Sequence, residues 1–264
     1  MRWRPRALPL VLGSAQMTSV RPQQGLVLEL LGVPGSGKTS LYADVRAMLA
    51  EAGVKLRRPK VPEHDALIEL YQTDRREFFD ASMRYLRSSV QHRVNSSGGD
   101  PKDLLREHAH LWFARCYEVE SALERPGVQL LEEGTVHELW RQYFFMRDAP
   151  FARWWTRQLW RTMPHCTGAV LVQATPQAAV RRIAGKRKLG PINRNLAAHS
   201  PTGDLWRQTD ASYHRLAARA LRRPTALVVD NNLDQRREEN AREITRTVLN
   251  LAAAKSPKRS PLDG

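Results

Sequence analysis

The sequence has only two cysteines, Cys116 and Cys166, among its 264 residues. So few cysteines exclude the disulfide framework of a secreted scaffold and favour a reducing compartment. The chain also lacks any apolar run close to the roughly 18 residues that a membrane-spanning helix needs. These absences predict a cytoplasmic protein with no membrane span.

Acidic residues are scarce relative to basic ones. The chain carries 42 Lys and Arg against 27 Asp and Glu, for a net charge of +15. Such an excess attracts polyanions, so a nucleic-acid partner stays open, but solvated arginine-rich helix faces are the favoured interpretation. Disorder throughout is excluded, because the chain is 42% hydrophobic and its seven Trp, six Tyr and six Phe need a core in which to pack.

The composition divides the chain into three parts. The first 25 residues hold four Arg and no acid, which predicts a disordered or targeting leader over 1–24, and Met17 is a second possible start. Residues 253–264 are typical of a solvated basic tail. One domain is expected between them, over 25–252.

Within this domain, short apolar runs alternate with segments of helical spacing. Strands separated by helices predict a parallel sheet with helices on both faces, a three-layer α/β sandwich with five strands. The strands are expected at 26–31, 54–61, 128–131, 169–172 and 226–229, and the helices at 40–52, 65–94, 101–123, 135–147, 150–162 and 233–251.

The segment GVPGSGKT, residues 32–39, fits the phosphate-binding pattern G-x-x-x-x-G-K-[ST]. It lies between an apolar strand and an amphipathic helix, which is the context that the pattern requires. Glycines let backbone N–H groups approach a phosphate, and the helix that follows directs its positive end to the same anion. Lys38 is expected to reach the β- and γ-phosphates of ATP, and the Thr39 hydroxyl to bind Mg²⁺. The expected nucleotide contacts are Gly32, Val33, Pro34, Gly35, Ser36, Gly37, Lys38, Thr39 and Ser40.

With this motif and layout, the chain resembles the P-loop NTPase superfamily, and within it the small-molecule and nucleotide kinases, over roughly residues 25–250. The resemblance implies an ATP-dependent phosphotransferase that moves the γ-phosphoryl group to a nucleoside, a nucleotide or a similar small acceptor. An LSGGQ signature and an N-K-x-D motif are both absent, which argues against a transport ATPase and a Ras-type GTPase. The alternative is a P-loop ATPase or switch that acts with a protein or nucleic-acid partner.

The resemblance also suggests roles for three carboxylates. Glu132, at the end of the strand 128–131, matches the acid that holds Mg²⁺ or orients an acceptor in such kinases, and Glu133 is then free to meet the substrate. Thymidylate-type kinases have Asp-Arg here, so the acceptor stays open, and a solvated acid pair is the simpler alternative. Glu63, after the expected second strand, is a candidate catalytic base.

Two further regions match such kinases in position. Residues 180–194 hold six basic residues and no acid, as in an arginine-rich lid that closes over the transferring phosphoryl group; the lid is expected over 180–200. Arg182 and Arg187 are its candidate catalytic arginines, followed by Arg194, and a solvated loop or nucleic-acid contact is the alternative. The helical stretch 65–124 corresponds to the acceptor-binding insertion, or simply to a helical pair with an aromatic core.

Overall fold

A four-stranded parallel sheet forms the centre of the molecule. The computed structural model describes residues 25–56, 59–146, 152–186, 190–222 and 226–255, so the expected leader and all of the expected tail beyond residue 255 lie outside the described residues. The strands are β1 (Leu26–Leu31), β2 (Val128–Leu131), β3 (Gly168–Gln173) and β4 (Ala226–Asp230), in the order β2-β1-β3-β4. All neighbouring strands run parallel. The predicted α/β sandwich is therefore confirmed.

The expected fifth strand, over 54–61, is wrong. Among its described residues only Leu56 pairs with the sheet, through one isolated parallel bridge to Val128. The N–H of Val54 instead donates to the carbonyl of Leu49 and closes the preceding helix. Pro59 and Pro62 have no N–H to donate, so the segment cannot extend the bridge into a regular ladder.

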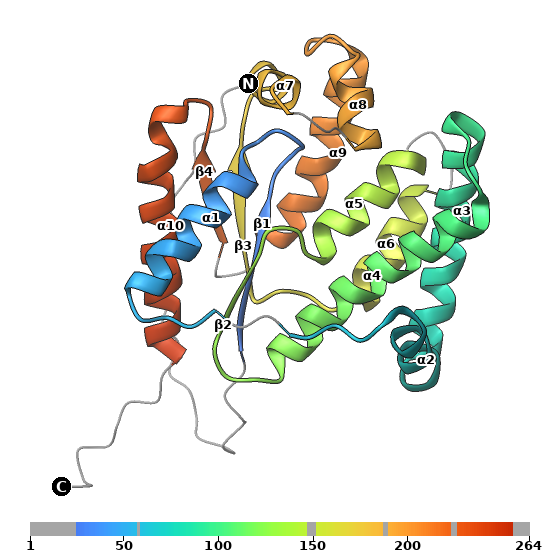
Figure 1. The fold of residues 1–264 in the computed structure, drawn as a ribbon, viewed down its shortest axis with the longest axis horizontal. Coiled ribbons are helices and arrows are strands. Elements are labelled where there is room, and N and C mark those ends of the chain that lie inside the picture. Colours follow the sequence, from blue (N-terminus) through green and yellow to red (C-terminus); the bar gives the residue numbers. More distant parts are fainter. Residues whose placement is uncertain (1–24, 57–58, 147–151, 187–189, 223–225, 256–264) are drawn as a thin grey trace, which may run out of the picture.

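One face of the sheet is covered by α1 (Lys38–Glu51) and α10 (Arg237–Lys255), as Figure 1 shows. Strand side chains alternate between the two faces, and Leu26, Leu28 and Leu30 of β1 all point into this layer. Each fully buried aliphatic side chain contributes roughly 1.5–3 kcal/mol to folding. The helices contribute Leu41, Val45, Leu49, Ala241, Ile244 and Val248.

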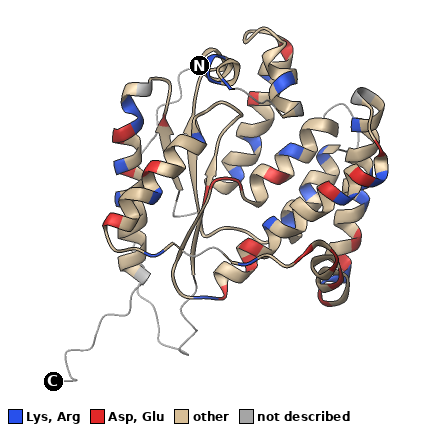
Figure 2. Ribbon diagram, viewed as in Figure 1, with Lys and Arg blue, Asp and Glu red and all other residues tan. Residues whose placement is uncertain are grey.

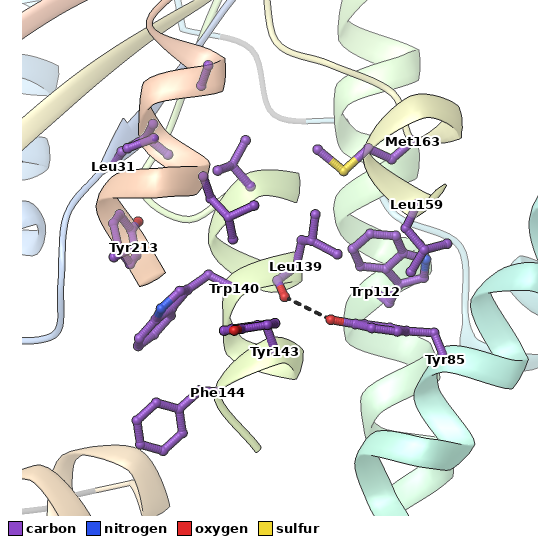
Figure 3. Packing of buried hydrophobic residues seen from close by; sticks show 14 of the residues in the cluster. Leu31, Tyr85, Trp112, Leu139, Trp140, Tyr143, Phe144, Leu159, Met163 and Tyr213 are labelled. Atoms are coloured by element: carbon purple, nitrogen blue, oxygen red, sulfur yellow. Dashed lines mark hydrogen bonds between the residues drawn. The ribbon is translucent and has the colours of Figure 1, made fainter. Parts of the chain in front are cut away.

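The opposite face is covered by α4 (Pro101–Leu123), α5 (Thr135–Met146) and α9 (Asp204–Ala220), with α2 (His64–Asp74), α3 (Arg76–Ser97) and α6 (Ala152–Thr162) packed farther out. Its core is rich in aromatic side chains. Figure 3 shows Trp140 of α5 beside Tyr213 of α9, with ring centroids 5.0 Å apart. Tyr85 of α3 donates a hydrogen bond of 3.4 Å to the carbonyl of Leu139. The stretch 65–124 thus forms helices with an aromatic core.

Two helices and a short turn complete the elements of the described residues. After β3 come α7 (Pro176–Ala184) and α8 (Pro191–Ala197), which span the described part of the expected lid, and the 3-10 turn η1 (Asp234–Arg236) precedes α10. The sequence patterns did not predict α9. None of the helices in the described ranges is long and apolar enough to cross a membrane.

Candidate active site

The loop at residues 32–39 connects β1 to α1 at the carboxyl edge of the sheet. Gly35 and Gly37 have φ values of 81° and 93°, which side chains with a Cβ rarely adopt. A Cβ on Gly35 would lie 2.4 Å from the carbonyl oxygen of Ala179, and one on Gly37 would lie 2.3 Å from Nδ2 of Asn231. Glycine is required at both positions because neighbouring groups pack directly against the backbone.

Lys38 is the first residue of α1 and is buried in the loop. Its Nζ donates hydrogen bonds of 2.6 Å to the carbonyl of Gly32 and 3.4 Å to that of Val33. Burial lowers the pKa of Lys38 to about 8, while Glu133 and Glu132 oppose this shift. A strongly bound anion beside this ammonium would favour its charged form.

Thr39 and Glu132 meet in the structure, as a joint role in binding Mg²⁺ requires. The Thr39 hydroxyl donates to Oε1 of Glu132, which follows β2. A hydroxyl and a carboxylate are hard oxygen ligands, and Mg²⁺ is usually bound by one or two such groups together with phosphate oxygens and water. No cluster of three or more His, Cys, Asp or Glu ligands occurs within the described ranges.

Arg182, on α7, lies behind the loop. Its guanidinium donates to the carbonyl oxygens of Asn231 (2.7 Å), Ser36 (3.3 Å) and Gly35 (3.5 Å). Nδ2 of Asn231 also donates to the Ser36 carbonyl, at 2.7 Å. Arg182 thus ties α7 and the end of β4 to the loop at 32–39, which the sequence predicts to bind a phosphate. The sequence suggested a lid arginine here, and Arg182 lines the cavity as well as holding the loop.

A cavity of about 680 Å³ opens beside the loop. This volume lies within the range of about 300–1,000 Å³ that is typical of small-molecule sites. The loop side is lined by Pro34, Gly35, Gly37, Lys38, Thr39 and Ser40, and α5 forms much of the opposite wall. Glu133, His137, Arg141 and Phe145, spaced four residues apart, all line this wall.

A chain of polar contacts connects Glu133 to the loop. Oε1 of Glu133 lies 3.3 Å from Nε2 of His137, and Nδ1 of His137 lies 3.3 Å from the Tyr213 hydroxyl. The Tyr213 hydroxyl in turn hydrogen-bonds to the backbone of Gly32. Burial lowers the pKa of His137 to about 3, so the imidazole is neutral and carries one proton. These contacts orient the Glu133 carboxylate, whose side chain is 46% exposed.

Glu29, in the middle of β1, fixes the segment that bears Glu132 and Glu133. Its carboxylate accepts hydrogen bonds from the backbone N–H groups of Gly134 (3.0 Å), His137 (2.9 Å) and Val136 (3.2 Å) at the start of α5. Burial raises the pKa of Glu29, and these N–H donors oppose that shift. Sequence reasoning missed this residue, although an acid within the apolar run LVLELL was a signal for it.

The remaining residues predicted from the sequence lie in different parts of the structure. Glu63 occupies the N-cap position of α2 without a capping hydrogen bond from its side chain, and it lines a second cavity, of about 630 Å³, which shares Glu107 with the first. Arg194 is exposed on α8, where Ile192 and Asn193 line the first cavity. Arg187 lies outside the described residues. Within the loop, Val33 packs into the core and the buried Oγ of Ser36 has no hydrogen-bond partner.

The fold is similar to that of solved kinases. Three structures of deoxyadenosine kinase from M. mycoides match the chain at 12% identity, over 84–86% of this chain and 100% of theirs. The TM-scores are 0.47 with bound dCTP, 0.48 with bound dATP and 0.50 with the products dCMP and a flexible dCDP. No protein-family model and no curated protein matches the sequence. The chain has the fold of a P-loop nucleoside kinase.

Proposed function

We propose that this protein is an ATP-dependent phosphotransferase that transfers the γ-phosphoryl group to a hydroxyl of a small acceptor of the nucleoside type. The observation that carries this proposal is the phosphate loop, with Lys38 and the Thr39–Glu132 pair, facing the α5 wall across one cavity. The fold shared with deoxyadenosine kinases supports an acceptor of this type.

On the donor side, backbone N–H groups of the loop and the ammonium of Lys38 bind the phosphates, with Arg182 holding the loop in place. Phosphate oxygens compete with the Gly32 carbonyl for Lys38. The Thr39 hydroxyl and the Glu132 carboxylate would hold Mg²⁺. When bound, this ion neutralises charge on the β- and γ-phosphates.

On the acceptor side, Glu133 accepts a hydrogen bond from the acceptor hydroxyl and orients its oxygen toward the γ-phosphorus. His137 keeps the carboxylate in position through the contact of 3.3 Å. Positioning of this kind, together with positive charge from Lys38, Arg182 and Lys186 at the cavity wall, supplies most of the catalysis in phosphoryl transfer.

The test is ATP-to-ADP turnover with Mg²⁺ across a panel of nucleosides, nucleotides and sugars. Lys38→Ala is the blank, and Lys55→Ala, at an exposed site outside the cavity, is the matched control. We expect an acceptor-dependent signal in the wild type and in Lys55→Ala that is lost in Lys38→Ala. ATP turnover that does not depend on any small acceptor, or that increases only with nucleic acid or protein, would instead identify an ATPase or switch.

The distribution of charge bears on that second function. Figure 2 shows Lys and Arg on helices of both layers, interleaved with Asp and Glu. The excess is nevertheless uneven, because the described residues from 152 to 222 carry eleven Lys and Arg against two acids. This uneven charge keeps a nucleic-acid partner as the second candidate, which the same panel tests.

A further inference from the structure

A third cavity lies between α6 and α9, which both pack against α5. Its volume is about 280 Å³. Its buried lining residues come from all three helices and are Tyr143, Thr156, Ser212 and Leu216. In the described part of the chain this cavity shares no lining residue with the one beside the loop. We call it the arginine groove, after the four arginines that also line it.

The four arginines stand on the two walls of the groove. Arg153 and Arg157 lie on α6, and Arg215 and Arg219 lie on α9. Residues four apart share one face of a helix and lie about 6 Å apart along its axis, so each wall presents two guanidiniums one turn apart. None of the described residues that line the groove is acidic. The groove therefore gathers positive charge within a small volume.

These cations have no acidic partners. Among the described residues, no group forms an ion pair or a hydrogen bond with any of the four guanidiniums. Arg219 instead lies over the Trp160 ring, with its Cζ 5.8 Å from the centroid. Helix α6 has no acidic residue, and the two acids of α9, Asp204 and Asp210, are paired with residues of α9 that do not line the groove. The repulsion among the four arginines is therefore uncompensated, and a bound anion would relieve it.

The donors of the groove suit an oxyanion with more than one negative charge. A guanidinium presents a planar fork of N–H groups that matches two oxygens of a phosphate, and such charge-assisted bonds are roughly twice as strong as neutral ones. The buried hydroxyls of Ser212 and Thr156 already donate to the backbone carbonyls of Thr209 and Ala152. Binding of an anion therefore depends on the arginines.

The dimensions of the groove limit the size of the ligand. Its 280 Å³ lies just below the range of about 300–1,000 Å³ that is typical of small-molecule sites, so a diphosphate group suits it better than a complete nucleotide. A nucleic-acid surface commonly contacts about 6–10 phosphates, whereas the four arginines cover about one helical turn on each wall. The groove thus favours a small phosphorylated compound over nucleic acid.

We propose that the arginine groove binds a diphosphate group, free or as part of a small compound, between the paired arginines of α6 and α9. This anion site is separate from the loop at 32–39. It does not depend on the proposed phosphotransfer, because none of its residues belongs to the loop or to the α5 wall of the cavity beside it.

The test is calorimetric titration of the full-length protein with diphosphate, with monophosphate and with a short oligodeoxythymidylate. Salt at about 0.15 M screens attraction to the net charge, and Mg²⁺ is omitted. We expect saturable binding of diphosphate that is about 10- to 100-fold tighter than that of monophosphate, because diphosphate accepts more charged hydrogen bonds. This binding should persist in Lys38→Ala, which removes the ammonium from the loop.

Variants locate the site. The double variant Arg157→Gln with Arg215→Gln removes one guanidinium from each wall and should weaken diphosphate binding about 10- to 100-fold. The control Arg46→Gln with Arg246→Gln removes the same charge from exposed sites on α1 and α10 and should bind as the wild type does. Arg157→Lys with Arg215→Lys keeps the charge without the planar fork and should be intermediate. Melting temperatures verify that each variant is folded.

Three outcomes would overturn the inference. The first is equal binding of diphosphate by the groove variant and its control, which would assign the binding to another surface. The second is loss of all diphosphate binding in Lys38→Ala, which would assign it to the loop. The third is saturable binding of the oligonucleotide without binding of diphosphate, which would indicate a nucleic-acid surface. None of these measurements uses ATP turnover, so failure of the proposed phosphotransfer leaves this site standing.

Discussion

Replacing Glu29 by Gln tests whether the carboxylate inside β1 holds the segment that bears Glu132 and Glu133. In the structure Oε1 accepts from the N–H groups of Gly134 and His137, and Oε2 accepts from that of Val136 and lies 3.8 Å from the thiol of Cys166. An amide oxygen can replace Oε1 and keep two hydrogen bonds. The amide nitrogen then faces the Val136 N–H, so two donors meet in a buried site.

The expected cost follows from that mismatch. A buried donor without a partner costs about 1–3 kcal/mol, and the lost bond is to a carboxylate, which is stronger than a bond to a neutral acceptor. Release from burying a charge offsets part of this loss. We expect Glu29→Gln to lower the free energy of unfolding by about 1–3 kcal/mol at pH 7. Glu29→Ala should cost more, because it leaves three N–H groups without partners and a cavity.

The measurement is urea unfolding from pH 5 to pH 8, with Glu51→Gln at the exposed end of α1 as the control. Burial raises the pKa of Glu29 above its ordinary value of 4.5, so the folded protein binds this proton more tightly than the unfolded chain. The wild type therefore loses the contribution of this group as the pH rises above about 4.5, while the variant does not. The difference between wild type and Glu29→Gln should shrink with rising pH. A variant as stable as the wild type at pH 7 would refute the reasoning.

Three further changes have defined outcomes. Thr39→Val should lower kcat/KM by about 100-fold or more at saturating Mg²⁺, and Thr39→Ser should recover most of the loss, as steady-state kinetics would show. Arg182→Gln should raise KM for ATP about 10-fold, with a smaller effect on kcat, because the residue mainly holds the loop. The control Arg181→Gln, at an exposed site, should change neither constant. A fall in kcat alone would instead favour the role of a lid arginine. His108 has a folded pKa of about 4 against an ordinary value of 6.5, so roughly 2–3 kcal/mol of stability should be lost as the pH falls from about 6.5 toward 4. Urea unfolding of His108→Gln should show a flatter pH dependence over that window, and an unchanged slope would contradict the assignment.

Local patterns were sufficient for much of the fold. The apolar runs at 26–31 and 128–131 form strands with those bounds, and the helical spacing of 101–123 forms α4. The glycine-rich loop at 32–39 was also evident, because its pattern consists of residues that are adjacent in the chain, and its binding of phosphate stays a prediction. The strand expected over 54–61 was wrong because a local segment does not reveal whether a neighbouring strand edge will pair with it, and Pro59 removes a donor at that edge.

The acceptor side of the site was much less predictable. Glu63 was a reasonable candidate for a base from its place after an expected strand, yet it lines a different cavity, at the start of α2. Arg182 was expected as a mobile lid residue, and its contacts with two loop carbonyls and with the carbonyl of Asn231 could not be read from its sequence neighbours. The spacing of His137 and Arg141, with Glu133 just before α5, was a visible signal for side chains on one side, but only the fold shows that they border the cavity.

The sequence alone determined the parallel α/β layers and the glycine-rich loop that ends in Lys38 and Thr39, because strand burial, helix periodicity and a glycine-rich turn are properties of contiguous residues. Tertiary structure decided everything that depends on residues distant in the chain. It joined Thr39 to Glu132, buried Glu29 under the start of α5, and brought Arg93 to Arg141 through a network from three helices. These contacts arise from how helices pack on the sheet, and no local pattern of residues predicts that packing geometry.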